Sequence, residues 1–216
     1  MPLAIPRDWT FKTSDVAGAF DRHVREQLPW YDLTTGVVAH VARHYIPEGG
    51  RVYDIGASTG NIGAALADTL AARQAEFVPI DNSAAMADIY CGPGELVVAD
   101  AADFDYQPFD LAVLFLCLMF VPPAKRADFI TRLREQLRPG GAIIVFDKCE
   151  PASGYVATVL WRLALAGKAA AGVEAKEILA KELSLGGVQR PISPRELDPA
   201  TEIFRFGDFA GWVIEK

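Results

Sequence analysis

The sequence predicts an α/β fold, with a mostly parallel sheet between helices and an antiparallel hairpin at its C-terminal end. Two patterns carry this prediction. From residue 51 to residue 148, short apolar runs alternate with helical patterns, which favours parallel strands joined by helices. Near the C-terminus, the β-like runs 201–206 and 209–215 are joined by Gly207-Asp208, a dipeptide suited to a tight hairpin.

Residues 1–46 are expected to form a helical arm that precedes the sheet. Its first 14 residues are predicted to be poorly structured. Apolar residues from Phe20 to Tyr31 then recur at helical spacing, interrupted by Pro29, and residues 33–45 form a second helix.

The first strand leads into a glycine loop, around which the rest of the chain is organised. Val52 to Asp54 read as a strand, the chain bends between Gly56 and Gly60, and a helix follows over residues 61–73. Glycines allow a sharp turn and close approach to a ligand, and the helix start offers free N–H groups. The loop lacks the middle glycine of the dinucleotide pattern, so a nucleoside-amino-acid ligand fits better than a pyrophosphate.

The next two predicted strands each end in an acid. Residues 76–80 form a short strand that ends at Asp81, and Ser83 or Asn82 can cap the short helix after it. The glycines and proline of residues 91–94 break that helix, and the strand 96–99 then ends at Asp100.

The centre and end of the sheet follow. Residues 109–118 are a continuous apolar run, typical of a strand buried on both faces. A helix from Pro122 and Pro123 to Leu137, a turn at residues 138–141 and a strand over 142–146 complete the parallel part. With the terminal hairpin, this gives seven strands in a Rossmann-like arrangement.

An insert over residues 151–195 is predicted to be helical and to cap a pocket. Val156, Val159, Leu160 and Leu163 fit one helix face, and residues 169–183 read as a second helix.

Composition narrows the classes of function. The chain has 216 residues, 51% of them hydrophobic, so we expect a single domain over residues 1–216. The longest apolar run, residues 111–121, is too short to span a membrane, and the first residues lack the order of a signal peptide. A formal net charge of −7 does not indicate nucleic-acid binding, although a nucleic-acid acceptor stays open.

Cysteines and histidines predict no metal site. Cys91, Cys117 and Cys149 lie far apart, which suits a reducing cytoplasm. His40 and His44 are four residues apart, but no acid or cysteine completes a ligand set with them.

The acids at the strand ends point to the ligand. In open α/β sheets, ligands bind outside the carboxyl ends of the strands. Asp81, about twenty residues past the glycine loop, is placed to accept hydrogen bonds from two ribose hydroxyls. Asp100 with the Ala101 backbone is placed to contact an adenine, and Asp54 can face an ammonium group directly or through water.

These motifs resemble those of the class I S-adenosylmethionine-dependent methyltransferases. Residues 52–60 look like their first motif, Ile80 to Ser83 with Met86 their second, Ala99 to Ala101 their third, and residues 137–141 the turn before strand five. The resemblance implies S-adenosylmethionine as cofactor, S-adenosylhomocysteine as product and no metal. It implies these cofactor-binding residues: Tyr31, Asp54, Gly56, Ala57, Ser58, Gly60, Asp81, Asn82, Met86, Asp100, Ala101 and Phe115.

Within that superfamily, the chain is most similar to the carboxy-S-adenosylmethionine synthases, which serve tRNA wobble-uridine modification. Phe20 and Val52 to Asp54 are among the similar positions, and Asp147-Lys148 stands in place of the family's Glu-Lys. Phe115 stands where that family has an asparagine, and Glu182 where it has an arginine that holds a carboxylate.

We therefore expect a methyltransferase that acts on a small molecule, a nucleoside or a nucleic acid. Methyl transfer from a sulfonium needs alignment more than side-chain chemistry, so the sequence names neither a catalytic residue nor the acceptor. Two alternatives remain: a carboxy-S-adenosylmethionine synthase that uses prephenate, and a non-catalytic cofactor-binding partner protein. A homodimer is also open.

Overall fold

A computed structural model describes residues 5–151 and 153–216, and it confirms the predicted α/β fold. Within these residues, seven strands form one sheet in the order β3-β2-β1-β4-β5-β7-β6. Strands β1 to β5 are parallel, while β7 runs antiparallel to β5 and β6. The strands are β1 (Arg51–Ile55), β2 (Glu76–Asp81), β3 (Val97–Val98), β4 (Phe109–Phe115), β5 (Leu137–Lys148), β6 (Thr201–Phe206) and β7 (Phe209–Glu215).

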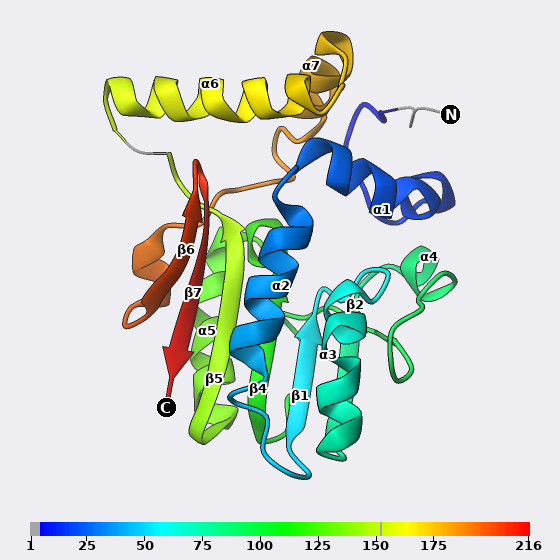
Figure 1. Cartoon of the computed structure of the whole chain (residues 1–216), viewed down its shortest axis with the longest axis vertical. Coiled ribbons are helices and arrows are strands. Elements are labelled where there is room, and N and C mark those ends of the chain that lie inside the picture. The colour runs from blue at the N-terminus through cyan, green and yellow to red at the C-terminus, as the bar shows by residue number, and fades with distance from the viewer. Residues whose placement is uncertain (1–4, 152) are drawn as a thin grey trace.

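Helices cover both faces of the sheet, with α2 and α3 on one face and α5 on the other (Figure 1). The helices of the described residues are α1 (Ser14–Gln27), α2 (Tyr31–Ala42), α3 (Asn61–Ala72), α4 (Ala84–Ala87), α5 (Pro123–Gln136), α6 (Tyr155–Ala170) and α7 (Ala175–Ser184), with the short 3-10 helices η1 (Leu118–Phe120) and η2 (Pro194–Leu197).

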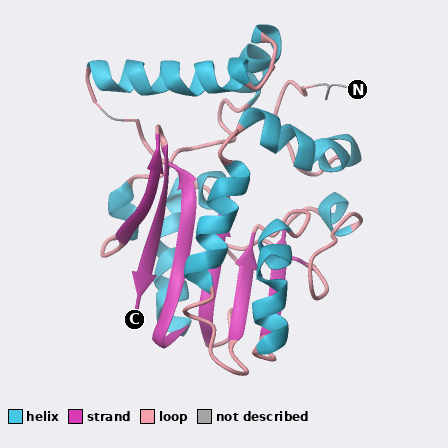
Figure 2. Ribbon diagram, viewed as in Figure 1, coloured by secondary structure: helices cyan, strands magenta, loops and turns pink. Residues whose placement is uncertain are grey.

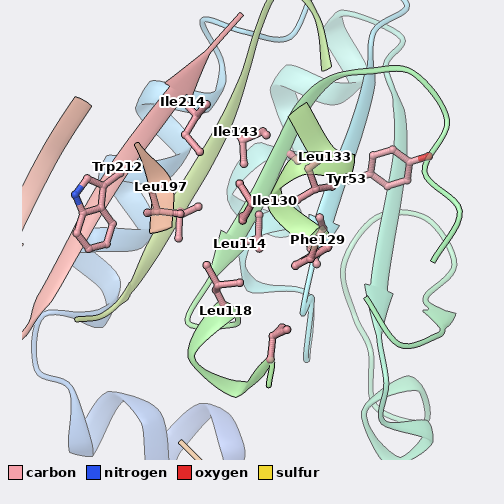
Figure 3. Packing of buried hydrophobic residues seen from close by; sticks show 14 of the residues in the cluster. Tyr53, Leu114, Leu118, Phe129, Ile130, Leu133, Ile143, Leu197, Trp212 and Ile214 are labelled. Atoms are coloured by element: carbon pink, nitrogen blue, oxygen red, sulfur yellow. The ribbon is translucent and has the colours of Figure 1, made fainter. Parts of the chain in front are cut away.

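Strand β4 is the buried centre of the sheet. All seven of its residues are buried, as its continuous apolar run predicts for a strand covered on both faces. In Figure 3, Phe129 and Leu133 of α5 lie beside Leu114 of β4, within one hydrophobic cluster. A second cluster on the opposite face includes Val38 of α2 and Leu66 of α3. The sheet is therefore a rigid base for the loops at its carboxyl edge.

Strand boundaries differ from the prediction in three places. The strand predicted over 109–118 ends at Phe115, because Leu116 takes a φ of +56° and the chain turns into η1. The strand predicted over 96–99 is reduced to the two residues of β3 at the sheet edge. The turn predicted at 138–141 is part of β5, whose pairing with β4 shifts register between Phe109 and Leu111.

The two helices predicted for the insert are both present, but the boundary between them differs from the predicted start of the second helix at residue 169. Helix α6 ends at Ala170 and α7 begins at Ala175, and between them Gly172 has a φ of +87°. Glycine reaches this left-handed backbone without a Cβ clash, so the chain can turn sharply at this point. Near the N-terminus, the helical pattern breaks next to Pro29, so that α1 ends at Gln27 and α2 begins at Tyr31.

The N-terminal arm packs against the helices. Residues 5–13 form neither helix nor strand, as predicted. Trp9 is nevertheless only 4% exposed, and its backbone N–H donates to the carbonyl of Ser184 at 2.9 Å. Residues 1–4 of the predicted arm and residue 152 of the predicted insert lie outside the described residues.

Helices α6 and α7 lie across the end of the molecule toward which the parallel strands run (Figure 1). In Figure 2, the arrowhead of β1 points toward α1 and toward this pair of helices. This is the place at which the sequence predicts a cap. No helix in the described part of the chain has both the length and the apolar character needed to cross a membrane.

Candidate functional site

The loop after β1 bends onto the carboxyl end of β2. Gly56 has a φ of +78° and Ser58 a φ of +50°, both in the left-handed region. The backbone N–H groups of Gly56 and Ala57 both donate to the carbonyl of Ile80, at 2.8 and 2.9 Å. A Cβ on Gly56 would come within 2.7 Å of the Cys117 sulfur. A glycine is therefore required here by both backbone conformation and space.

Asp81 at the end of β2 holds two loops together. Its Oδ2 accepts the backbone N–H of Ser58 and its Oδ1 that of Ser83, both at 2.9 Å. Burial raises the pKa of Asp81, while these backbone hydrogen bonds act in the opposite direction. Each carboxylate oxygen keeps a further lone pair, so the group can still accept hydrogen bonds from a diol.

Asp54 in β1 is buried and incompletely paired. It is 1% exposed, and its Oδ2 has no hydrogen-bond partner among the described residues. Burial, reinforced by the charge of Asp81, raises the pKa of Asp54 to about 7. An unpaired carboxylate oxygen in a cavity wall is costly unless a ligand or water donates to it, so this atom fits an ammonium group.

The remaining predicted residues surround these acids. Asp100 is exposed, and its Oδ1 accepts the backbone N–H of Ala102 at 2.9 Å, so it also shapes the turn after β3. Met86 is fully buried. Tyr31 meets Phe115 edge to face, with ring centres 5.4 Å apart. Burial raises the pKa of the Tyr31 phenol, which stays protonated at neutral pH.

A cavity of about 170 Å³ brings eleven of the twelve predicted cofactor residues together. Gly60 is the exception: it does not line this cavity, and its φ of +97° and its close approach to the Gly92 backbone explain the glycine instead. The roles of the eleven stay predictions. They are Tyr31, Asp54, Gly56, Ala57, Ser58, Asp81, Asn82, Met86, Asp100, Ala101 and Phe115.

Sequence reasoning missed part of this wall. Phe11, Phe20 and Phe120 line the cavity, although they are far apart in the sequence and carry no motif. Cys117, which follows β4, also lines the cavity. Among the described residues that line this cavity, none is a lysine, arginine or histidine.

A larger chamber of about 440 Å³ adjoins the first cavity. The two share four lining residues, Phe11, Phe20, Leu116 and Phe120. The chamber lies between α1, the N-terminal arm, the cap helices and the β6–β7 turn, and most of its wall is apolar or aromatic. Its aromatic residues are Trp9, Phe11, Phe20, Trp30, Phe120, Trp161, Phe206 and Phe209.

Ionisable groups are few in the chamber, and several are paired. Lys168 bonds to Glu182 at 2.8 Å, and Lys148 donates to the Gln189 side chain at 3.2 Å. Lys181 is 9% exposed and lies over the ring of Trp9. Burial, and then the charge of Lys168, lower the pKa of Lys181 to about 5, so the amine is neutral at pH 7.

His23 on α1 is the other buried basic group of the chamber wall. It is 4% exposed, stacks on Trp9 with ring centres 5.5 Å apart, and neither ring nitrogen has a hydrogen-bond partner among the described residues. Burial, and then the charge of Lys181, lower its pKa to about 4. Its ring lies near Glu26 and Glu177, a grouping that the sequence did not reveal because Glu177 is 154 positions away from His23 (177 − 23).

Comparisons with known proteins point to a methyltransferase family. A family model described as a methyltransferase domain matches residues 52–141. A carboxy-S-adenosyl-L-methionine synthase of Ectopseudomonas mendocina is 30% identical over 206 residues, which cover 89% of this chain and 83% of the relative. A protein of the same name from Staphylococcus epidermidis is 27% identical over 212 residues, 96% of this chain and 92% of the relative.

A solved structure shows the same fold. The crystal structure of a candidate O-methyltransferase from Nostoc punctiforme PCC 73102 superposes with a TM-score of 0.59 at 19% identity. The match covers 94% of this chain and 60% of that chain, so this chain spans less than two thirds of its length. Both curated relatives carry the name of the family that the sequence motifs resemble.

Proposed function

The chain belongs to the carboxy-S-adenosyl-L-methionine synthase family of class I S-adenosylmethionine-dependent methyltransferases, and on this premise we propose that it methylates a largely apolar small molecule. S-Adenosylmethionine is the methyl donor in this proposal, and S-adenosylhomocysteine is the product. One observation carries it: the cavity lined by the predicted cofactor residues shares a wall with a larger, mostly apolar chamber.

The smaller cavity has the groups that this donor requires. Asp81 is placed to accept from the ribose hydroxyls, and Asp100 with the backbone of Ala101 to contact the adenine. The unpaired Oδ2 of Asp54 fits the ammonium group of the amino-acid end. Carboxylates that accept hydrogen bonds from charged or multiple donors form the stronger class of such bonds, which supports these three assignments.

The protein's part in the reaction is to align and to exclude water. A bound sulfonium supplies an already activated methyl group, so the reaction itself requires no metal. Phe11, Phe20 and Phe120 line both cavities and would keep water from the boundary between them. Holding the acceptor in line with the methyl group at near-attack distance accounts for the rate, without a dedicated base unless the acceptor must lose a proton.

The chamber indicates the class of acceptor. A volume of about 440 Å³ falls within the range of small-molecule sites, which are mostly apolar with a few polar groups. The walls of Trp30, Trp161 and Phe209 favour a ring or an alkyl chain over a charged polymer. A net charge of −7 supports a small molecule over a nucleic acid.

A carboxy-S-adenosylmethionine synthase that uses prephenate is the second candidate, because the relatives carry that name. A carboxylated sulfonium needs a cation for its extra carboxylate. Within the described residues, no cation lines the cofactor cavity, and Arg162 and Arg190 of the insert line neither cavity. The adjoining chamber has three lysines: Lys168 is paired with Glu182, which stands at the position of the family's arginine, Lys148 donates to Gln189, and burial lowers the pKa of Lys181 to about 5. The lack of a cation in the cofactor cavity itself supports methyl transfer as the first candidate.

The reaction is proposed for the cytoplasm, because the three cysteines are free and a reducing compartment keeps cysteines in that form.

The experiment that tests the proposal uses S-adenosylmethionine labelled in the methyl group. The purified protein is incubated with this donor and a small-molecule extract of cells. We expect label in an apolar, extractable product, and much less of it with the Asp81→Asn variant at a limiting concentration of the donor. Cofactor binding without any transfer of label would instead support a non-catalytic cofactor-binding protein.

A further inference from the structure

We propose that His23, Glu26 and Glu177 bind one Zn²⁺ ion between α1 and α7, and that this ion fastens the cap to the body of the protein. The three ligand atoms, one nitrogen and two carboxylate oxygens, lie within 4.8 Å of one another. This site is separate from the methyl-transfer chemistry and does not depend on the proposed function.

The helices bring the ligands together. His23 and Glu26 are three residues apart on α1, a spacing that puts two side chains on one helix face. Glu177 reaches them from the first turn of α7, with its Oε1 3.7 Å from Nδ1 of His23. In a tetrahedral zinc site with bonds of about 2.0–2.1 Å, ligand atoms stand about 3.4 Å apart. Small side-chain rotations are therefore enough to reach zinc geometry.

The histidine is an independent sign of a missing ligand. His23 is 4% exposed, yet neither of its ring nitrogens has a hydrogen-bond partner among the described residues. Leaving buried polar atoms without partners costs free energy, and buried polar groups are rarely left so. Its stacking on Trp9 fixes the ring plane. A metal bound by one nitrogen would satisfy this atom.

The charges around the cluster permit a cation. The two glutamates supply two negative charges, against which Arg22 lies 3.6 Å from Glu26. Lys168 is paired with Glu182, outside the cluster. Two carboxylates against the single guanidinium of Arg22 leave the cluster with a net negative charge, which attracts a divalent ion.

The donor set selects the metal. One imidazole nitrogen with two carboxylate oxygens suits zinc, which takes such mixed nitrogen and oxygen ligands with water in the fourth position. Magnesium and calcium prefer all-oxygen sites. Because the ion would connect α1 to α7, its binding would add to the contact between these two helices, in which Gln27 donates to Glu177 at 3.3 Å.

The test is zinc binding by the full chain, measured by calorimetry with ZnCl₂ alone, together with the thermal midpoint of unfolding. We expect one zinc per chain and a higher midpoint with zinc. Glu177→Gln and His23→Gln should each weaken zinc binding at least ~10-fold, since both remove a direct ligand, and should lose the zinc-dependent rise in midpoint.

Two controls separate this site from adventitious binding. Glu174→Gln changes a glutamate at the N-cap of the same helix α7, and His40→Gln disrupts the surface pair of His40 and His44. Both should bind zinc like the unmodified protein. The proposal fails if the unmodified protein shows no saturable binding, if Glu177→Gln binds as tightly, or if only His40→Gln removes binding. Glu177 has a side chain 22% exposed, so this variant remains informative even if His23→Gln does not fold.

Discussion

The carboxyl of Asp54 makes the free energy of unfolding depend on pH. Its pKa is about 7 in the folded chain, against 3.8 for the ordinary group, chiefly because of burial. Between these values the unfolded chain has lost the proton while the folded chain keeps it, so stability falls as pH rises. Above about pH 7 both forms are ionised, and the loss stays constant.

We therefore predict that Asp54→Asn gains stability relative to the unmodified protein as pH rises from about 5 to 7, by up to about 1.4 kcal/mol per pH unit, and then levels off. Urea unfolding of both proteins across this range measures the difference. Asp147, whose pKa burial also raises to about 7, is present in both proteins and cancels. A difference that does not change with pH would contradict the assignment.

Asp81 is expected to dominate cofactor affinity among single side chains at the strand ends. Asn at this position keeps one oxygen to accept from the loop backbone but loses the charge. Asp81→Asn should weaken S-adenosylmethionine binding by about 1.5–3 kcal/mol, the range for hydrogen bonds to charged groups. Calorimetry provides the measurement, with Asp88→Asn, an exposed acid at the end of α4 that lines neither cavity, as the control. Unchanged affinity would remove Asp81 from the site.

Gly56 faces two constraints, and they can be separated. Gly56→Val should abolish cofactor binding, because a side chain meets both a φ of +78° and the Cys117 sulfur. Both the backbone strain and the contact with Cys117 should also make the variant unfold more easily. Adding Cys117→Gly to Gly56→Ala should recover part of the stability by urea unfolding, since it removes the clash and leaves the strain. If stability did not recover, the backbone conformation at residue 56 alone would account for the loss of stability.

Position along the chain explains which site residues the sequence could reveal. Asp54, Asp81 and Asp100 follow from the rule that ligands bind at the carboxyl ends of parallel strands. Phe11 and Cys117 could not be predicted by this rule. Phe11 reaches the cavity from an arm that has no periodic pattern, and Cys117 reaches it through a turn at Leu116, which has an unusual φ of +56°.

At the scale of elements, α6 is expected to affect acceptor binding and not cofactor affinity. Ala164 lines the chamber from this helix, whereas Ala166, two residues on, is exposed and lines neither cavity. Ala164→Phe should lower transfer of labelled methyl groups at least ~10-fold by filling acceptor space, because misplacement of a reactant strongly slows reaction. Its affinity for S-adenosylmethionine should not change.

Ala166→Phe is the matched control for this substitution and should behave like the unmodified protein in both assays. If Ala164→Phe weakened cofactor binding and left turnover intact, the chamber could not be the acceptor site.

The elements themselves could be predicted where apolar periodicity was strong. The buried run of β4, the helix α5 and the terminal hairpin follow from pattern and turn residues. The position of the break between α6 and α7 could not be predicted, because a single glycine inside an alanine-rich stretch is tolerated in many helices, and here Gly172 takes a φ of +87° and turns the chain.

For the whole molecule, the sheet order and the cap together create two chambers on one edge. The parallel strands place the predicted cofactor acids at their carboxyl ends, and α6, α7 and the N-terminal arm enclose the neighbouring space (Figure 1). Contacts between segments as distant as Trp9 and Ser184 build this enclosure. No local pattern encodes such a contact, so the sequence could predict that a cap exists but not the chamber beneath it.

The measurement that tests the central claim most directly is the mass of the nucleoside product. The protein is incubated with S-adenosylmethionine, prephenate and a small-molecule cell extract, and the nucleosides are analysed by mass spectrometry. If the protein transfers methyl groups, S-adenosylhomocysteine and a methylated acceptor accumulate together, and their amounts do not depend on prephenate. Prephenate-dependent formation of S-adenosylmethionine heavier by a carboxylate would contradict it and would identify the protein as a carboxy-S-adenosylmethionine synthase.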